Sequence, residues 1–234
     1  MRYSLARTAS APSAVDRDSS NAADSATEIL IPDPPRCRSS IRLARAEKTF
    51  FAVWWSLRKD SSAALLTSRS DDGEPWTKPI AADTTDASGR GCTRPAPAIA
   101  SDVVSGYVHI AYFAEPSSGA GVFYVHSMDR GESFHAPVPL VFGARPSNTA
   151  VSAEGGRVAA AYEDPNSSRP RIFAALSKTM GHIFELKLPV SEESAVAANP
   201  TAHLRGTKLE VSWTEIDPAD STRRRQASRT GTWK

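Results

Sequence analysis

Short apolar runs recur along the chain, and polar segments separate them. Four of these runs end in an aromatic residue, and they cover residues 50–54, 108–112, 158–162 and 209–213. Runs of this length between turn residues are typical of β-strands. No long helical periodicity interrupts them, so the pattern predicts an all-β chain of short strands joined by turns.

A second pattern follows each run. Residues 127–134 read Ser-Met-Asp-Arg-Gly-Glu-Ser-Phe, which is Ser-x-Asp-x-Gly-x-x-aromatic. Arg69 replaces the serine of the first copy, Thr179 replaces the aspartate of the third, and the fourth copy is one residue short. The closing aromatics are 58, 50 and 49 residues apart, and they are Trp76, Phe134, Phe184 and Trp233. This is the period of a four-stranded blade, so the repeats predict four blades of a β-propeller, each with one such hairpin turn.

The ends of the chain bear on how the blades are arranged. Residues 1–25 are poor in large apolar groups and are predicted to be a disordered tail before a propeller domain at 26–234. The last blade lacks a fourth strand, and residues 27–32 resemble the fourth strand at 138–141. Two arrangements stay open: a four-bladed ring closed by residues 27–32, and a fragment of a six-bladed propeller without two of its blades.

The turn motifs resemble the bacterial neuraminidase repeat, or Asp-box, of the sialidase superfamily, over about residues 26–234. The resemblance implies the propeller architecture, but many non-enzymatic propellers carry the same repeats. Enzymes of the superfamily have an aromatic-Arg-Ile-Pro motif whose arginine holds the substrate carboxylate. Only the arginine is kept here, as Arg38 in Cys-Arg-Ser-Ser. The tyrosine nucleophile and the two carboxylates that the resemblance also implies cannot be placed by motif.

The architecture predicts where a ligand would bind. Each inner strand begins on the same face as the loop between the second and third strands of its blade. This places Arg38, Arg94, Arg145 and Asn199 around a central mouth. The loops add charged residues, namely Arg58, Asp60, Glu115, Glu163, Asp164, Glu215 and Asp217. Three guanidinium groups favour an anion site, whereas pairs such as Arg94 with Glu115 or Arg145 with Asp164 would make a collar of salt bridges without a ligand.

Catalytic candidates are few. Tyr162 followed by Glu163 could be a nucleophile and its partner, but an aromatic residue takes the same position in every blade and is more simply a packing residue. Glu215 could be an acid/base or a ligand for sugar hydroxyls, or a solvated loop carboxylate. If the chain is a sialidase, its nucleophile is to be sought among Tyr112, Tyr124 and Tyr162.

Charge and composition exclude several classes. The 28 basic and 26 acidic residues leave a net charge of +2, which favours neither nucleic acid nor an anionic membrane as partner. The arginine run 223–225 is expected to be a solvated loop. No apolar stretch approaches the roughly 18 residues of a membrane span. The N-terminus has no continuous apolar region of a secretory signal, so the sequence as written would be cytoplasmic, or this start is not the natural one. The compartment stays open, since the superfamily is often exported.

The remaining reactive side chains predict no cofactor. Cys37 and Cys92 are expected as free thiols; a disulfide is the alternative and requires their α-carbons to lie within about 7 Å. The five histidines, at positions 109, 126, 135, 182 and 203, show no metal-ligand spacing, so no metal site is expected.

Three functions follow as hypotheses. The first is a sialidase-like module that binds an anionic or glycan ligand, or a protein, at its mouth. The alternatives are an exo-α-sialidase-type glycoside hydrolase and a protein-interaction scaffold without a small-molecule site.

Overall fold

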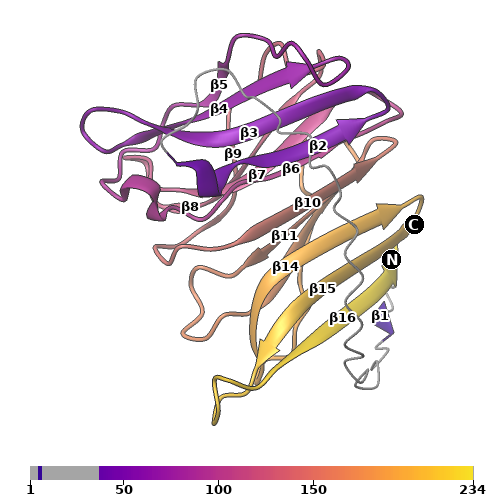
Figure 1. Ribbon diagram of the computed structural model, residues 1–234. Helices are drawn as coiled ribbons and strands as arrows, with labels where there is room; N and C mark the ends of the chain where they lie inside the picture. The colour runs from indigo at the N-terminus through magenta and orange to yellow at the C-terminus, as the bar shows by residue number, and fades with distance from the viewer. Residues whose placement is uncertain (1–4, 7–36, 234) are drawn as a thin grey trace, which may run out of the picture.

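The computed structural model describes residues 5–6 and 37–233 of the chain. It contains four four-stranded antiparallel sheets, and two 3-10 turns, η1 (Arg38–Ser40) and η2 (Gly91–Thr93), are its only helical segments among these residues. Each sheet is one blade, and the four blades lie next to one another in chain order from blade 1 at the top to blade 4 at the bottom (Figure 1). The all-β architecture of four-stranded blades is therefore confirmed.

The strands follow one another through the blades in chain order. Blade 1 consists of β2 (Arg42–Ala46), β3 (Thr49–Leu57), β4 (Ala63–Ser70) and β5 (Ile80–Asp83). Blade 2 consists of β6 (Ala98–Ser101), β7 (Val108–Ala114), β8 (Gly121–Ser127) and β9 (Val138–Phe142). Blade 3 consists of β10 (Thr149–Glu154), β11 (Arg157–Glu163), β12 (Ile172–Ser177) and β13 (Leu186–Pro189). Blade 4 consists of β14 (Val196–Arg205), β15 (Lys208–Ile216), β16 (Arg224–Thr232) and the distant β1 (Leu5–Ala6).

The core lies in the seams between successive blades. Three of the predicted aromatic positions in the second strands are buried there, with exposed fractions of 0% for Tyr112, 2% for Tyr162 and 4% for Trp213. The fourth, Trp54, is 1% exposed but packs on the side of blade 1 that faces away from blade 2. In β7 every residue is buried because blades cover both of its faces. In β15 buried and exposed positions alternate, because only blade 3 packs against that sheet.

Three of the four predicted turn motifs form closely related turns. In blade 2 the Ser127 hydroxyl accepts hydrogen bonds from the amides of Asp129 (3.3 Å) and Gly131 (2.7 Å). In blade 3 Ser177 binds the amides of Thr179 (3.1 Å) and Gly181 (3.0 Å) in the same way. Local hydroxyl-to-amide bonds of this kind replace the ladder bonds that a chain loses when it turns.

The first and last motifs differ from the prediction. In blade 1 Ser70, rather than the residue at position 69, accepts the hydrogen bond from Gly73 (2.9 Å), so the turn is one residue shorter. The fourth motif makes no turn at all, because residues 224–232 form the continuous strand β16. Only its aromatic is in the expected environment, since Trp233 is 3% exposed and packs in the seam between blades 3 and 4.

Among the described residues, the first and last blades do not pack side by side as successive blades do. Successive inner strands lie side by side from β2 through β6 and β10 to β14, whereas β2 and β14 lack such packing in the described part of the chain. Figure 1 shows these two strands apart. The strand next to β16 is β1, which pairs antiparallel through Leu5 with Gly231 and Ala6 with Thr230. Residues 27–32, the predicted closing strand, and the rest of the predicted tail lie outside the described residues.

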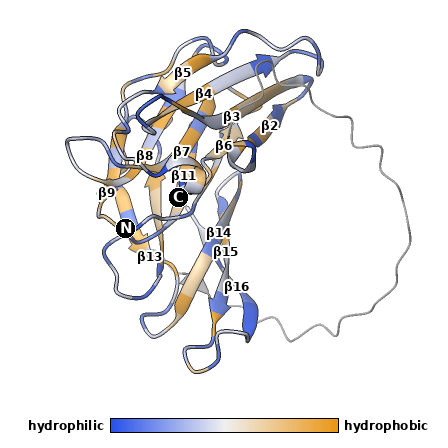
Figure 2. Cartoon of the chain, turned by 60° about the vertical axis from the view of Figure 1, so that its left-hand side comes forward, coloured by the Kyte–Doolittle hydropathy of each residue, from blue (hydrophilic) through white to orange (hydrophobic). Residues whose placement is uncertain are grey.

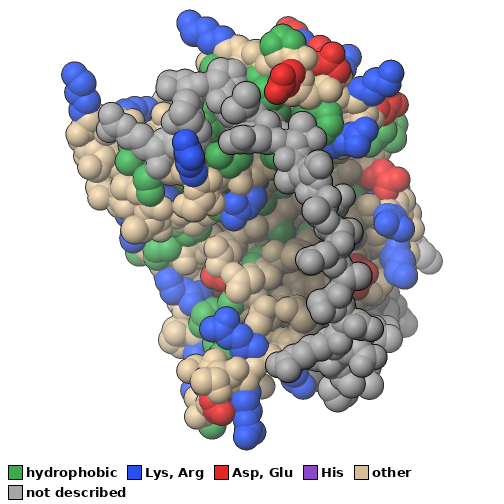
Figure 3. All heavy atoms as spheres, in the orientation of Figure 1, with side chains coloured by type: hydrophobic (Ala, Val, Ile, Leu, Met, Phe, Trp, Pro, Cys, Tyr) green, Lys and Arg blue, Asp and Glu red, His purple; other side chains and the backbone are tan. Residues whose placement is uncertain are grey.

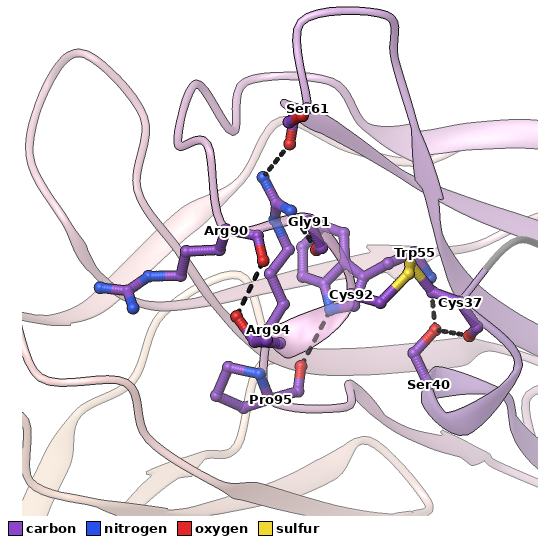
Figure 4. Close-up of a disulfide and its surroundings, with 10 residues drawn as sticks. Cys37, Ser40, Trp55, Ser61, Arg90, Gly91, Cys92, Arg94 and Pro95 are labelled. Atoms are coloured by element: carbon purple, nitrogen blue, oxygen red, sulfur yellow. Dashed lines mark hydrogen bonds between the residues drawn. A yellow bond between two sulfur atoms is a disulfide. The ribbon is translucent and has the colours of Figure 1, made fainter.

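The two cysteines form a disulfide, so the expectation of free thiols is wrong. The α-carbons of Cys37 and Cys92 are 5.1 Å apart, within the reach that the alternative required. The bond ties η1 of blade 1 to η2, which precedes the first strand of blade 2 (Figure 4). The indole of Trp55 lies beside it and donates a hydrogen bond to the Pro95 carbonyl (2.9 Å). The two cysteines are 55 residues apart in the sequence, and only the packing of neighbouring blades brings them together. The sequence alone could therefore not decide whether they pair.

Candidate functional site

The predicted mouth lies where the inner strands begin. β2, β6 and β10 start four residues after Arg38, Arg94 and Arg145, so the three arginines occupy equivalent loop positions. Asn199 lies inside β14, beside an irregularity in its pairing with β15, and has a left-handed φ of 54°. The fold thus aligns the arginines but places Asn199 further into its strand.

Arg94 is committed to a buried ion pair. Its side chain is 1% exposed, and its Nη2 lies 2.5 Å from an Asp86 carboxylate oxygen whose side chain is 2% exposed. The same guanidinium donates to the Ser88 carbonyl (2.5 Å). The predicted pair of Arg94 with Glu115 is wrong, because Glu115 pairs with Arg90 (2.9 Å). Arg94 therefore holds the loop before β6 and is not available to a ligand.

The other two arginines do not complete an anion site with it. Arg145 donates to the backbone carbonyl of Asp164, not to its carboxylate as the collar interpretation had it. The Asp164 carboxylate instead accepts from the Asn166 amide (3.1 Å) and the Ser167 hydroxyl. Arg38 lies in η1 with an exposed side chain. The three guanidinium groups therefore have separate environments.

A groove runs along the inner strands. It has a volume of about 390 Å³ and is lined by residues of β2, β6, β10 and β14, together with the residues just before β6 and β10. Its polar lining consists of Arg42, Asn148, Thr149, Asn199 and Thr201. Figure 3 shows the molecule hollowed between the upper blade 1 and the lower blade 4. The groove therefore combines a guanidinium, two amides and two hydroxyls on strands from three blades.

A buried carboxylate organises the amides of this groove. Glu163, at the end of β11, is 6% exposed and accepts hydrogen bonds from the Asn148 side chain (2.9 Å) and the Asn199 backbone amide (2.9 Å). The Asn148 amide also reaches the Asn199 side-chain oxygen at 3.2 Å. One carboxylate thus fixes the orientation of amides from two neighbouring blades, and these amides face an open groove.

Glu215 borders a different hollow, of about 500 Å³, at the end of blade 4. The carboxylate is 6% exposed, accepts from the Trp213 indole (3.2 Å) and pairs with Arg225. Asp217 and Arg224 also line this hollow. Glu215 is therefore a buried, paired carboxylate near the end of β15 (Lys208–Ile216), rather than a free loop group.

The candidate tyrosines lie in the seams and not at the groove. Burial raises the pKa of Tyr162 above its ordinary value, and the nearby Asp164 carboxylate raises it further. Burial also raises the pKa values of Tyr112 and Tyr124, and the Tyr112 hydroxyl donates to Asp83 (2.6 Å). None of the tyrosines in residues 37–233 lines the groove or the second hollow.

Sequence reasoning placed some loop residues correctly and missed the groove's own side chains. Arg58 donates to the Thr84 carbonyl (2.8 Å), and Asp60 accepts from the Ser62 hydroxyl (2.6 Å), so both stabilise their loop. Arg42 and Asn148 were not predicted. The available signal was their place at the start of, or just before, an inner strand, where a polar side chain reaches the channel.

The described residues contain neither a metal-binding cluster nor a membrane-spanning helix. Within residues 37–233 no group of three His, Cys, Asp or Glu side chains is arranged to hold a metal ion. The described part of the chain also contains no helix long and apolar enough to span a membrane.

Neither a family model nor a curated protein matches the sequence. Solved structures do resemble the fold. An α-L-arabinanase of Penicillium chrysogenum complexed with arabinobiose matches with a TM-score of 0.54 and 12% identity, over 84% of this chain and 64% of that protein. The Hadza microbial sialidase Hz136 matches at 0.51 and 16%, over 83% and 46%. An α-L-arabinofuranosidase of Fusarium graminearum matches at 0.51 and 13%, over 81% and 56%.

These similarities establish the fold: the chain is similar to β-propeller glycoside hydrolases. Because the identities are low, they carry no substrate or catalytic residue to this chain. The chain spans between about half and two thirds of the length of these proteins.

Proposed function

We propose that the protein is a glycan-binding module and that the glycan lies in the groove along the inner strands. The observation that carries the proposal is the Glu163–Asn148–Asn199 network at the edge of this groove. Sugar hydroxyls are recognised by amides and carboxylates that are held in fixed orientations, because each hydroxyl both donates and accepts. Two of the similar structures, a sialidase and an arabinanase complexed with arabinobiose, support a glycan as the class of ligand.

Arg42 is the one charged side chain among the described residues that line this groove, and it favours a sugar that carries a carboxylate. Its Nη1 donates to the carbonyls of Ser39 (3.0 Å) and Ile41 (2.7 Å), which fixes the guanidinium at the start of β2. A guanidinium held in this way binds a carboxylate well. Arg42 takes the role that the sequence assigned to Arg38, Arg94 and Arg145.

Calorimetry and thermal unfolding with sialyllactose and with neutral arabino-oligosaccharides test the proposal. A glycan that binds only the folded state raises Tm. We expect Asn148→Ala to weaken binding of any active glycan about tenfold, and Arg42→Ala to weaken only that of the acidic one. Arg224→Ala, in the second hollow, is the matched control and should bind like the parent protein. The proposal fails if no glycan binds, or if Asn148→Ala, folded by circular dichroism, binds unchanged.

A glycoside hydrolase is the second candidate, since Glu163 and Glu215 lie at the same end of the blades as the inner-strand starts. Most such enzymes use two carboxylates, one of which must be free to exchange a proton or attack the sugar. Here hydrogen bonds or an ion pair engage both of them. Release of a fluorophore from aryl α-sialoside or aryl α-L-arabinofuranoside, lost in Glu163→Gln or Arg38→Ala, would favour this candidate. Absence of both binding and turnover would favour a protein-interaction scaffold.

A further inference from the structure

Four of the five histidines gather at one seam although the sequence scatters them. His109 of β7 and His126 of β8 are direct cross-strand partners in blade 2. His135 follows the turn of blade 2, and His182 belongs to the turn of blade 3. The ring centres of His126 and His135 are 4.5 Å apart, those of His126 and His182 are 4.6 Å apart, and those of His135 and His182 are 5.5 Å apart. These residues are called the histidine cluster below.

The inner members of the cluster are buried without an ion partner. His109 and His126 are 1% and 2% exposed, whereas His135 and His182 are exposed at the rim. The two ring nitrogens of His126 are buried and have no hydrogen-bond partner. His109 Nδ1 forms a hydrogen bond of 2.6 Å with the Tyr124 hydroxyl. A buried imidazole with unsatisfied nitrogens is poorly suited to carry a charge.

The groups that face the cluster supply little compensating charge. From the loop before β7 come Asp102 and Tyr107; the Asp102 carboxylate attracts a proton toward His109 but also binds the Ser105 hydroxyl (2.7 Å). On the blade 3 turn, the Glu185 carboxylate accepts from the Lys178 backbone amide (3.1 Å). On the blade 2 turn, Asp129 is engaged by its own turn. Among the described residues, the other charges that act on His109 and His126 come from the imidazoles themselves, which repel one another once protonated.

The cluster also lies beside a tight contact between the two blades. The Tyr124 hydroxyl of blade 2 donates to the Met180 carbonyl of blade 3 (3.4 Å). A Cβ built on Gly181 would lie 2.0 Å from the Tyr124 hydroxyl oxygen, so this glycine allows the turn to close on the ring. The Tyr124 and Phe184 rings meet edge to face at 4.9 Å. A change in charge at His109 or His126 therefore acts directly on the contact that joins blades 2 and 3.

We propose that the histidine cluster is a proton-operated switch of the seam between blades 2 and 3, which is closed when the imidazoles are neutral and opens when His109 and His126 take up protons. The ligand in this proposal is the proton; within residues 37–233 no group of three His, Cys, Asp or Glu side chains is arranged to hold a metal ion. The switch concerns the fold itself and does not depend on a glycan in the groove.

The direction of the response follows from the buried imidazoles. Burial, together with repulsion from His126, lowers the pKa of His109 to about 3, against the attraction of Asp102. Burial, together with His135 and His182, lowers the pKa of His126 to about 4. Imidazoles in the opened state return toward their usual pKa of about 6.5. Below that value the opened seam binds more protons than the closed one, so opening is favoured as pH falls from about 6.5 to about 4.

Hydrogen exchange at pH 7.5 and pH 5.0, corrected for the intrinsic pH dependence of exchange, tests the switch. We expect the amides of β8 and of residues 178–184 to lose protection by on the order of tenfold at pH 5.0, while those of blade 4 keep theirs. His126→Phe retains a flat ring without a titrating group and should abolish most of this loss. His203→Phe, which changes the exposed histidine of blade 4, is the matched control and should respond like the parent protein.

Several outcomes would overturn the proposal. These are unchanged protection of the seam at pH 5.0, an equal loss in His126→Phe and the parent protein, and a loss spread evenly over all blades. If His126→Phe does not fold, imidazole proton NMR of the parent protein decides. The switch requires two histidines that titrate far below the usual pKa of about 6.5, and their absence from the NMR titration would overturn it.

Discussion

At the residue scale, Thr179 shows that a turn depends on hydrogen-bonding capacity more than on residue identity. In blade 2 the Asp129 carboxylate accepts from the amides of Glu132 (3.0 Å) and Ser133 (2.9 Å). In blade 3 the Thr179 hydroxyl accepts from the Ile183 amide (2.9 Å) and keeps the turn closed. Burial opposes the charge of Asp129, yet hydrogen bonds from Ser133, Ser127 and the turn amides lower its pKa to about 2. The neutral threonine needs no such compensation.

Gly181 gives the first prediction at this scale. Its φ is +89°, and a Cβ there would overlap the Tyr124 ring, so Gly181→Ala combines backbone strain with overpacking. We expect it to lower the free energy of unfolding by about 2–4 kcal/mol in urea titrations. Gly155→Ala is the control, because its φ is +58° and no atom lies within 4 Å of the added carbon. Similar losses in the two variants would show that only backbone strain matters.

At the scale of elements, the sequence predicts strands far better than it predicts pairs of side chains. The second strands of all four blades were found from their apolar positions. Burial between two blades requires continuous apolar residues, as in β7, whereas one covered face requires alternation, as in β15. The segment at Arg38 was expected to begin a strand but forms η1. Residues 228–233 were expected to form a turn, but 228–232 belong to β16. The ion pair of Arg94 with Asp86 depends on how neighbouring loops pack in space, and this packing cannot be deduced from the spacing of residues in the sequence.

The disulfide between η1 and η2 gives the prediction at the scale of elements. It closes a loop over a sequence separation of 55 residues and joins the starts of two blades. Because a cross-link restricts the unfolded chain, we expect the double variant Cys37→Ser/Cys92→Ser to lose about 2–4 kcal/mol of unfolding free energy. A reductant should bring the parent protein to the same value and leave the variant unchanged. A parent protein that is insensitive to reductant and has two free thiols when unfolded would contradict the bond.

At the scale of the whole molecule, the outer faces of blades 1 and 4 differ, that is, the faces that point away from blades 2 and 3. Blade 1 carries Trp54, Trp76 and partly buried Phe50 and Leu66 on the side away from blade 2. The corresponding side of blade 4 is polar, and Figure 2 shows hydrophilic positions along its strands. Its residues there include Thr201, His203, Arg205, Lys208, Glu210 and Ser212. A polar outer face is typical of the terminal repeat of a stacked array. Repeat spacing could not decide between a four-bladed ring and a fragment of a six-bladed propeller. It gives the number of blades but not the polarity of their outer faces.

The outer face of blade 4 gives the last prediction. If solvent covers this face, a charge placed at its centre costs little, so Ser212→Lys should change the free energy of unfolding by less than about 0.5 kcal/mol. Val211, the next residue of β15, is 2% exposed in the seam with blade 3. Val211→Lys buries an unpaired charge there and should unfold blade 4, seen as loss of exchange protection in β14–β16. If Ser212→Lys proves as damaging as Val211→Lys, then apolar structure must cover the outer face, as a further blade of a larger propeller would.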